Sequence, residues 1–314
     1  MATGPPAGRP EAGGHTVCGV IGLLLKDPAL EPELGSLVTP MIEALSDRGP
    51  DSSGIALYSR TEGSGDDGWR VSLASDRPVD WSAVCDAVVG RFRAVARPLP
   101  SGALLEVTDV QAEEVMAHVA EQWPEVRTVA TGRRVVVIKD TGRPEDTARS
   151  VGLSRWGGYL AVAHTRMATE SAVTLLHSHP FVPAPDLCVV HNGSFSNYAS
   201  VRRSLQSRGV RFDSDNDSEV AARLLAERLG SGDDLEEATR WIMKELDGFF
   251  TLVITTTEGM SVVRDAFACK PAVVAETDRY VAVASEYRAL AHLPDIGGAD
   301  VFEPQPEEVY TWTH

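Results

Sequence analysis

Cys18-Gly19-Val20-Ile21-Gly22 is the stretch that decides how this chain folds, because it places a cysteine directly before an apolar, strand-like run. A thiol is a weak nucleophile until a nearby base removes its proton. A free α-amino group can act as that base, since its pKa is about 7.7 to 8.0. Cys18 would therefore be reactive if it were the first residue of the mature protein. Taken alone, the same five residues also fit a small cysteine buried at the start of a core strand.

Seventeen residues precede Cys18, and as written they block its amine. They are rich in Gly, Pro and Ala and hold no apolar stretch long enough for a signal peptide, so we expect a disordered leader over residues 1–17. Two routes would expose Cys18: autocatalytic removal of a propeptide, or a mis-assigned start. We favour the second route, because Val17 can be a GTG initiation codon read as methionine, and removal of that methionine leaves Cys18 first.

The composition of the 314 residues restricts the kinds of partner. With 45 acidic and 29 basic side chains, the formal net charge of -16 disfavours binding to nucleic acid and to anionic lipid headgroups. The longest apolar runs have the length of strands, far short of the roughly 20 residues of a membrane span. The four cysteines are widely spaced, so neither a metal site nor a disulfide framework is indicated, and a reducing cytoplasm fits best.

The hydrophobic pattern outside residues 61–157 predicts an α+β fold in which antiparallel sheets pack against helices. Strands are expected over 20–25 and 52–58, separated by a helix over 32–45 and a polar turn. Ser285 is the expected N-cap of a helix over 286–291. The remaining expected strands cover 159–164, 187–191, 249–255, 260–264, 272–275 and 280–284, and the remaining helices cover 197–208, 217–229 and 235–246.

Residues 61–157 have a different pattern and are expected to form a small α+β insert. Their predicted order is β-α-β-α-β, which suits a compact ferredoxin-like lobe. The predicted strands cover 71–74, 103–107 and 135–139, and the predicted helices cover 81–92 and 112–122.

Four further stretches carry the residue types that amide hydrolysis needs: a nucleophile, a proton acceptor, stabilisation of a tetrahedral oxyanion, and a grip on the substrate. Their order along the chain is more specific than any single stretch, since an isolated Asn-Gly is usually a turn. The stretches are Arg-Gly-Pro-Asp-Ser-Ser-Gly at 48–54, His-Thr-Arg-Met-Ala-Thr at 164–169, His-Asn-Gly at 191–193 and Asn-Asp-Ser-Glu at 216–219.

Together with Cys18, these motifs resemble those of class-II glutamine amidotransferases, a family of N-terminal-nucleophile hydrolases. The resemblance covers residues 18–58 and 159–312, and it implies a four-layer αββα sandwich over residues 18–314, interrupted by the 61–157 insert. The phrases His-Thr-Arg-Met-Ala-Thr-Glu-Ser from His164 and Ala-Cys-Lys-Pro-Ala-Val from Ala268 are closest to the glutamate-synthase-like branch. That branch includes the amidotransferase subunit of N-methylglutamate synthase.

The resemblance implies a role for each motif. Cys18 would be the nucleophile, and the Asn192 side chain and the Gly193 N–H would form the oxyanion hole. Arg166 would bind the α-carboxylate of glutamine with its planar fork, and Asp217 would pair with the α-ammonium. The alternatives for these last two residues are a surface ion pair and a helix cap.

Other residues near the motifs receive lesser roles. Thr169 and His179 match substrate-pocket positions, and Arg48 is expected to order the loop around Cys18. His164 and His191 are expected to be packed residues, because the N-terminal amine already supplies the base. The Lys270-Pro271 pair is interpreted as a structural turn, and no catalytic role is expected for the other cysteines, Cys85, Cys188 and Cys269.

The resemblance implies a glutaminase subunit that hydrolyses L-glutamine through a Cys18 thioester and passes ammonia to a glutamate-synthase-like partner. The chain has no Gly-rich dinucleotide loop or P-loop, so no cofactor is expected in it, and flavin and iron-sulfur groups would belong to partner subunits. Two alternatives remain. One is a stand-alone hydrolase of another γ-glutamyl amide, and the other is a non-catalytic subunit whose Cys18 amine stays blocked.

Overall fold

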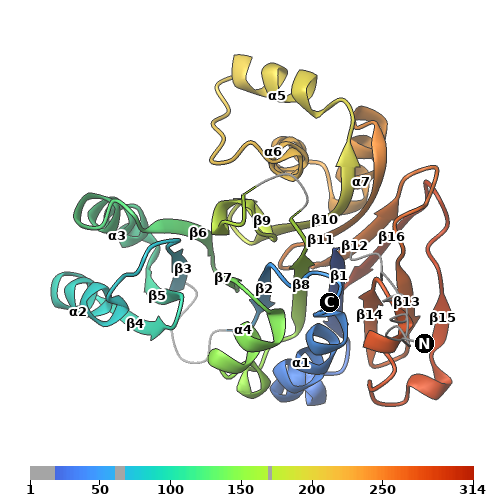
Figure 1. The fold of residues 1–314 in the computed structure, drawn as a ribbon, viewed down its shortest axis with the longest axis horizontal. Helices are drawn as coiled ribbons and strands as arrows, with labels where there is room; N and C mark the ends of the chain where they lie inside the picture. Colours follow the sequence, from blue (N-terminus) through green and yellow to red (C-terminus); the bar gives the residue numbers. More distant parts are fainter. Residues whose placement is uncertain (1–17, 61–67, 169–171) are drawn as a thin grey trace, which may run out of the picture.

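Two β-sheets lie face to face at the centre of the molecule, with helices on both outer faces (Figure 1). The computed structural model describes residues 18–60, 68–168 and 172–314, so the predicted leader and Thr169 lie outside the described residues. The first sheet runs in the order β15 (Asp300–Phe302), β13 (Val273–Glu276), β14 (Tyr280–Ala284), β1 (Gly19–Leu25), β8 (Leu160–Arg166), β2 (Ser52–Tyr58) and β7 (Val135–Thr141). The second runs in the order β16 (Val309–Thr313), β12 (Gly259–Arg264), β11 (Gly248–Thr255), β10 (Leu187–Phe195) and β9 (Phe181–Ala184).

Strand β1 is buried on both faces, because alternate side chains of a strand point to opposite sides of its sheet. Ile21, Leu23 and Leu25 belong to the core under the outer helices. Val20 and Leu24 belong to the core between the two sheets. A strand with two apolar faces has a continuous apolar sequence, and this is why residues 20–25 are Val-Ile-Gly-Leu-Leu-Leu.

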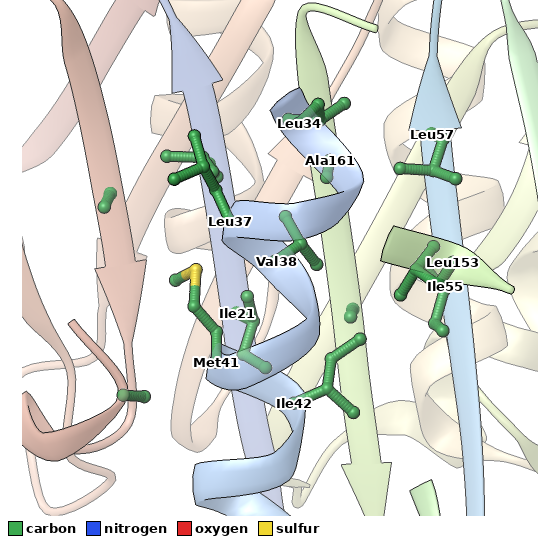
Figure 2. Packing of buried hydrophobic residues seen from close by; sticks show 14 of the residues in the cluster. Ile21, Leu34, Leu37, Val38, Met41, Ile42, Ile55, Leu57, Leu153 and Ala161 are labelled. Carbon is green, nitrogen blue, oxygen red and sulfur yellow. The ribbon is translucent and has the colours of Figure 1, made fainter. Parts of the chain in front are cut away.

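Helix α1 (Leu34–Leu45) covers the outer face of the first sheet. Figure 2 shows Val38 and Met41 of this helix beside Ile21 of β1. On the same side lie η1 (Pro28–Glu33), α4 (Pro144–Ser150), η2 (Leu153–Arg155) and η4 (Tyr287–Ala289). On the inner face the sheets approach closely at Gly22, where an added Cβ would lie 2.6 Å from the Met260 sulfur.

The outer face of the second sheet is covered by α5 (Tyr198–Ser207), α6 (Asp217–Gly230) and α7 (Leu235–Glu245). Val220 and Leu224 of α6 and Ile242 of α7 are buried in one cluster with Leu252 and Ile254 of β11. The predicted four-layer αββα sandwich is thereby confirmed. None of the helices in the described ranges has the length and apolar character that a bilayer crossing requires.

A separate four-stranded sheet lies beyond β7 (Figure 1). Its strands run in the order β4-β5-β3-β6, and with its two helices the chain order is β-α-β-β-α-β, the ferredoxin-like arrangement. A cluster of its own, including Val71, Val84 and Val115, fills this lobe. Its elements are β3 (Gly68–Ala74), α2 (Trp81–Arg91), β4 (Ala94–Leu99), β5 (Gly102–Thr108), α3 (Asp109–Gln122) and β6 (Arg127–Gly132).

The structure corrects the expected limits and strands of the insert. The strand predicted over 135–139 is β7, which pairs along its whole length with β2 and so belongs to the main sheet. From β7 onward the chain packs on the sandwich, which makes the predicted range 61–157 too long. Strands β4 and β6 were not predicted, because both are edge strands of their sheet, and β4 is mostly exposed and contains Pro98.

Ser285 does not cap a helix, which is a second correction. Its hydroxyl accepts a 2.9 Å hydrogen bond from the Val20 N–H, and its own N–H donates to the Val20 carbonyl at 3.1 Å. The predicted helix over 286–291 is the three-residue 3-10 turn η4, which begins after Glu286. Ser285 instead ties the end of β14 to the residue that lies two places after Cys18.

Candidate active site

Cys18 lies directly before β1, near the middle of the seven-stranded sheet. Strands β1 and β8 are antiparallel, with Gly19 opposite Thr165, so the start of β1 lies beside the end of β8. The Cys18 thiol is partly buried and donates to the Met167 carbonyl at 3.7 Å. The antiparallel register therefore brings the His-Thr-Arg-Met motif to the proposed nucleophile.

The Cys18 carbonyl oxygen accepts hydrogen bonds from the turn after α1 and from the second sheet. Arg48, which follows α1, donates to it from Nε at 3.3 Å and from Nη2 at 3.2 Å. Asn192, in β10 of the second sheet, donates from Nδ2 at 3.1 Å. Arg48 also forms an ion pair with Glu286, with Nη1 2.5 Å from Oε1. These contacts fix the backbone of Cys18, and the second Nδ2 hydrogen of Asn192 stays available to another acceptor.

Asn192 and Gly193 are not a turn, because both lie inside β10, opposite Thr251 and Phe250 of β11. Gly193 has a φ of +150°, a conformation that side chains rarely allow. An added Cβ would lie only 2.1 Å from the Phe249 carbonyl oxygen. Glycine is therefore required for the backbone to follow this course beside Asn192.

Arg166 ends β8 and is 4% exposed. Its Nη1 donates to the Ala172 carbonyl at 3.1 Å. Burial lowers the pKa of the guanidinium, and the neighbouring Cys18 and Asp51 act against this shift. Asp51 also holds the local backbone, because its carboxylate accepts from the Ala168 N–H at 2.8 Å and its N–H donates to the Arg166 carbonyl at 3.1 Å. The guanidinium is thus a fixed cation near the thiol.

Asp217 is the first residue of α6, and the N-cap is Asn216, whose side chain accepts from the Ser218 N–H at 2.8 Å. The carboxylate of Asp217 accepts from the Phe195 N–H at 2.9 Å and is 21% exposed. It therefore links α6 to the end of β10, three residues after Asn192. A helix N-terminus favours a negative charge at this place.

Three buried histidines, His164, His179 and His191, lie behind this edge of the sheets. The rings of His164 and His179 are 4.2 Å apart, and His191 Nδ1 lies 2.7 Å from the Ser218 hydroxyl. Burial lowers the pKa of His164 to about 3 and that of His191 to about 4, and it places the pKa of His179 well below its ordinary value. All three rings are therefore neutral at physiological pH.

His179 was expected at the substrate pocket, but its ring packs inward against His164 and Phe181. Neither of its ring nitrogens has a hydrogen-bond partner among the residues that the structure describes. In this arrangement the His179 ring packs against residues that support the site and does not point into it. Thr169, the other predicted pocket residue, is outside the described ranges.

Burial also changes the pKa values of the cysteine thiols. Burial raises the pKa of the Cys18 thiol, whereas its contact with Met167 and the charges of Arg166 and Lys270 act in the opposite direction. Burial raises the pKa of Cys85 to about 11 and that of Cys188 to about 12. Arg166 and Lys270 both act on Cys18, although its thiol still needs a base at neutral pH.

Two contributors to this site could not be recognised from the sequence. Glu286 fixes Arg48 and gave no motif signal of its own, because it comes close only through the pairing of β14 with β1. Lys270 was interpreted as part of a turn, yet its charge reaches Cys18. Within residues 18–60, 68–168 and 172–314, no group of three or more His, Cys, Asp or Glu side chains could hold a metal ion.

Three comparisons with known proteins agree with this arrangement. Residues 164–292 match a family profile described as a glutamine amidotransferase domain. The chain is 44% identical over 301 residues to the glutamine amidotransferase-like protein GlxB of Rhizobium meliloti, and the match covers 95% of this chain and 99% of that protein. It is 33% identical over 165 residues to the glutamine--fructose-6-phosphate aminotransferase of Chlamydia caviae, which covers 52% of this chain and 27% of that enzyme.

A solved structure supports the fold. The chain superimposes with a TM-score of 0.61 on the structure described as the allosteric regulatory enzyme of purine biosynthesis, at 19% identity. The match covers 94% of this chain and 46% of the other, so this chain spans about half the length of that enzyme. The αββα sandwich and the 44% identity to GlxB over nearly the full length of both chains lead to one assignment. This chain belongs to the class-II glutamine amidotransferase family.

Proposed function

We propose that this chain hydrolyses L-glutamine to glutamate and ammonia through a thioester at Cys18. The observation that carries the proposal is the convergence of Arg48, from the turn after α1, and Asn192, from the second sheet, on the Cys18 carbonyl oxygen, with Arg166 beside the thiol. These contacts support the proposal that Cys18 is the nucleophile, Asn192 an oxyanion donor and Arg166 the cation that binds the substrate.

In the first step, Cys18 Sγ attacks the side-chain amide carbon of glutamine. The thiol proton passes to the α-amine of Cys18 and from there to the leaving nitrogen, so ammonia departs and a thioester remains. Water then attacks the thioester, releasing glutamate and restoring the thiol. The α-amine is needed as the base because burial keeps the thiol protonated at neutral pH, and the lowered pKa values of His164 and His191 make their neutral rings too weakly basic to accept the thiol proton.

The negative oxygen of the tetrahedral intermediate would receive hydrogen bonds from Asn192 Nδ2 and from the Gly193 N–H. Removing one such donor costs about 10²- to 10³-fold in rate in other hydrolases. Arg166 would bind the α-carboxylate of glutamine and Asp217 its α-ammonium, so the site would read both ends of a free amino acid. Thr169 and His179 would complete the pocket, His179 from behind.

We further propose that the ammonia passes to glutamate-synthase-like subunits, which would carry any flavin or iron-sulfur group. The match to GlxB over 99% of its length supports it, since an amidotransferase region can then make up a whole chain and leave the acceptor site to another protein. We place the protein in the cytoplasm, because its four cysteines are unpaired.

The mechanism depends on a free Cys18 amine, and intact-mass measurement of protein from its own host tests it. We expect the active protein to begin at Cys18. A fully active population that retains residues 1–17 would rule out the amine as base, and an inactive population that retains them would favour the non-catalytic subunit.

Dependence on a partner is tested by measuring glutamine turnover for the chain alone and together with the proteins encoded beside its gene. We expect slow turnover alone and faster turnover in the complex. Equal rates in both samples, with no co-purifying protein, would favour a stand-alone hydrolase acting on γ-glutamyl amides.

A further inference from the structure

Lys270 lies beside the strand that carries the proposed oxyanion donors. Its carbonyl oxygen accepts a 2.8 Å hydrogen bond from the Thr251 hydroxyl, and Thr251 is directly opposite Asn192 in the β10–β11 pair. Its ammonium nitrogen lies 5.5 Å from the centre of the Phe249 ring, and Phe249 is opposite Ser194, the residue after Gly193. The main chain of Lys270 and its ammonium group thus both contact β11, the strand that pairs with Asn192 and Gly193.

The Lys270 ammonium has no carboxylate partner in the part of the chain that the structure describes, and its side chain is half-buried. Lys26, by contrast, pairs with Glu276 at 2.6 Å, and Lys139 donates to the Ser178 carbonyl at 2.7 Å. A cation without a carboxylate partner keeps its charge available for a negative charge that forms nearby during the reaction.

Other charged groups near Cys18 already form ion pairs or hydrogen bonds, or would do so when glutamine binds. Arg48 is paired with Glu286, and Asp51 holds the Ala168 N–H. In the proposed function Arg166 is neutralised by the α-carboxylate of bound glutamine. Lys270 then keeps its charge available to the thiolate and to the oxyanion that follows it.

We propose that Lys270 stabilises the Cys18 thiolate and the oxyanion formed from it, acting through its charge and not by binding the ends of the substrate. The part that concerns the oxyanion rests on the proposed function, whereas the part that concerns the thiolate does not. In support, the charge of Lys270 acts against the rise that burial causes in the pKa of the Cys18 thiol. It also contributes to the lowered pKa of His191, which precedes Asn192.

The polar and charged groups around Cys18 come from several elements, and the test must separate Lys270 from all of them. They are Arg166 and the Met167 carbonyl after β8, Arg48 after α1 with its partner Glu286, Asp51 before β2, and His191 of β10 with Asp217 of α6.

The experiment measures how fast iodoacetamide alkylates Cys18 between pH 7 and pH 11, in the full chain and without glutamine. The parent protein carries Cys269→Ala, because Cys269 is exposed, and peptide mass spectrometry follows the Cys18 peptide. Lys270→Met and Lys270→Gln remove the charge and keep the main-chain contact with Thr251. Lys270→Arg keeps the charge, and Lys244→Met removes a charge from the exposed part of α7.

We expect the Met and Gln variants to raise the midpoint of the alkylation curve by about one pH unit, the shift that a nearby unit charge produces. Alkylation at neutral pH would then be about tenfold slower, because the thiolate fraction falls tenfold per pH unit. Lys270→Arg and Lys244→Met should follow the parent curve. Two neutral variants are used so that a folding defect in one, seen by circular dichroism, does not decide the result.

Unchanged midpoints in the folded neutral variants would overturn the proposal, and so would an equal rise in Lys270→Arg or in Lys244→Met. The readout needs no glutamine hydrolysis, so it is independent of the proposed function. A chain without glutaminase activity that still shows the shift would refute that function and keep the role of Lys270 at the thiol.

Discussion

Arg48 and Glu286 form an ion pair, with Nη1 2.5 Å from Oε1, and the same guanidinium donates two hydrogen bonds to the Cys18 carbonyl. The pair joins the connection after α1 to the residue that precedes η4, and so it closes one side of the nucleophile. A second arginine, Arg288, also lies 2.5 Å from the Glu286 carboxylate, but it has no contact with Cys18 in the described structure.

We predict that Glu286→Gln lowers kcat about 3- to 10-fold, because Arg48 would lose its charged anchor and hold the Cys18 backbone less firmly. Arg288→Gln is the matched control, since it removes the other half of the cluster and leaves Arg48 in place. Steady-state glutamine turnover measures both. Equal losses in the two variants would show that the effect is general and not transmitted through Arg48.

Asn192→Ala should lower kcat about 10²- to 10³-fold with little change in KM, because an oxyanion donor acts mainly in the transition state. Gly193→Ala should instead destabilise the protein, since its Cβ would meet the Phe249 carbonyl at 2.1 Å. Kinetics for the first and thermal unfolding for the second separate chemistry from packing. A raised KM with an unchanged kcat in Asn192→Ala would contradict the assigned role.

For the substrate grip, Arg166→Lys should raise KM about 10- to 100-fold although the charge is kept, because lysine cannot make a bidentate contact with a carboxylate. Asp217→Asn should do likewise, since its amide oxygen can still accept from the Phe195 N–H but carries no charge. Glutamine saturation curves give both values. Variants that lose kcat at an unchanged KM would place these residues elsewhere in the mechanism.

Cys18→Ala should abolish both glutamine turnover and labelling by a glutamine-like electrophile. Cys269→Ala, which removes an exposed thiol, should leave both largely intact. Turnover assays and intact-mass spectra of the labelled proteins give the answer. Labelling that persists in Cys18→Ala would put the nucleophile at another residue.

The buried histidines predict an acid-sensitive fold. Their pKa values are lower in the folded protein, about 3 for His164 and about 4 for His191, than the ordinary value of 6.5, so the unfolded chain binds more protons at mildly acidic pH. Their contribution to stability is fully present above about pH 6.5 and falls as the pH drops towards 4, by about 1.4 kcal/mol per pH unit for each histidine.

Urea unfolding between pH 4 and 8 measures this slope. His164→Phe keeps an aromatic ring against His179 and removes one titrating group, so the slope should fall by about one proton. An unchanged slope in this variant would mean that His164 is not neutral when folded.

Local sequence patterns predicted the elements that are apolar on both faces, and those that are apolar on one face and polar on the other. Strand β2 was predicted with the observed limits, 52–58, because it is buried along its whole length. Strands β4 and β6 were missed because edge strands need fewer apolar residues. The strand at 135–139 was predicted but assigned to the wrong sheet, since the pattern of a strand does not say which partner it pairs with.

The residues of the site also differ in whether a local pattern could predict them. Cys18, Asn192 and Gly193 could be named in advance because they lie in short motifs whose residue types suit one chemistry. Glu286, Ser285 and Lys270 could not be, because each reaches the neighbourhood of Cys18 only through strand pairing or loop packing. The inward position of His179 also depends on the packing of two sheets.

The position of the lobe has a consequence for assembly. Tyr58 is directly opposite Val135, so everything from β3 to β6 replaces what would otherwise be a hairpin loop between β2 and β7. A two-residue Asn-Gly turn could therefore replace it without changing the order of any core strand. Strand β7 is the last of its sheet, and its Val137 N–H now donates to Ser72 of the lobe at 2.9 Å. Without the lobe that edge would be open to pairing with another chain, so the lobe protects the sandwich against aggregation.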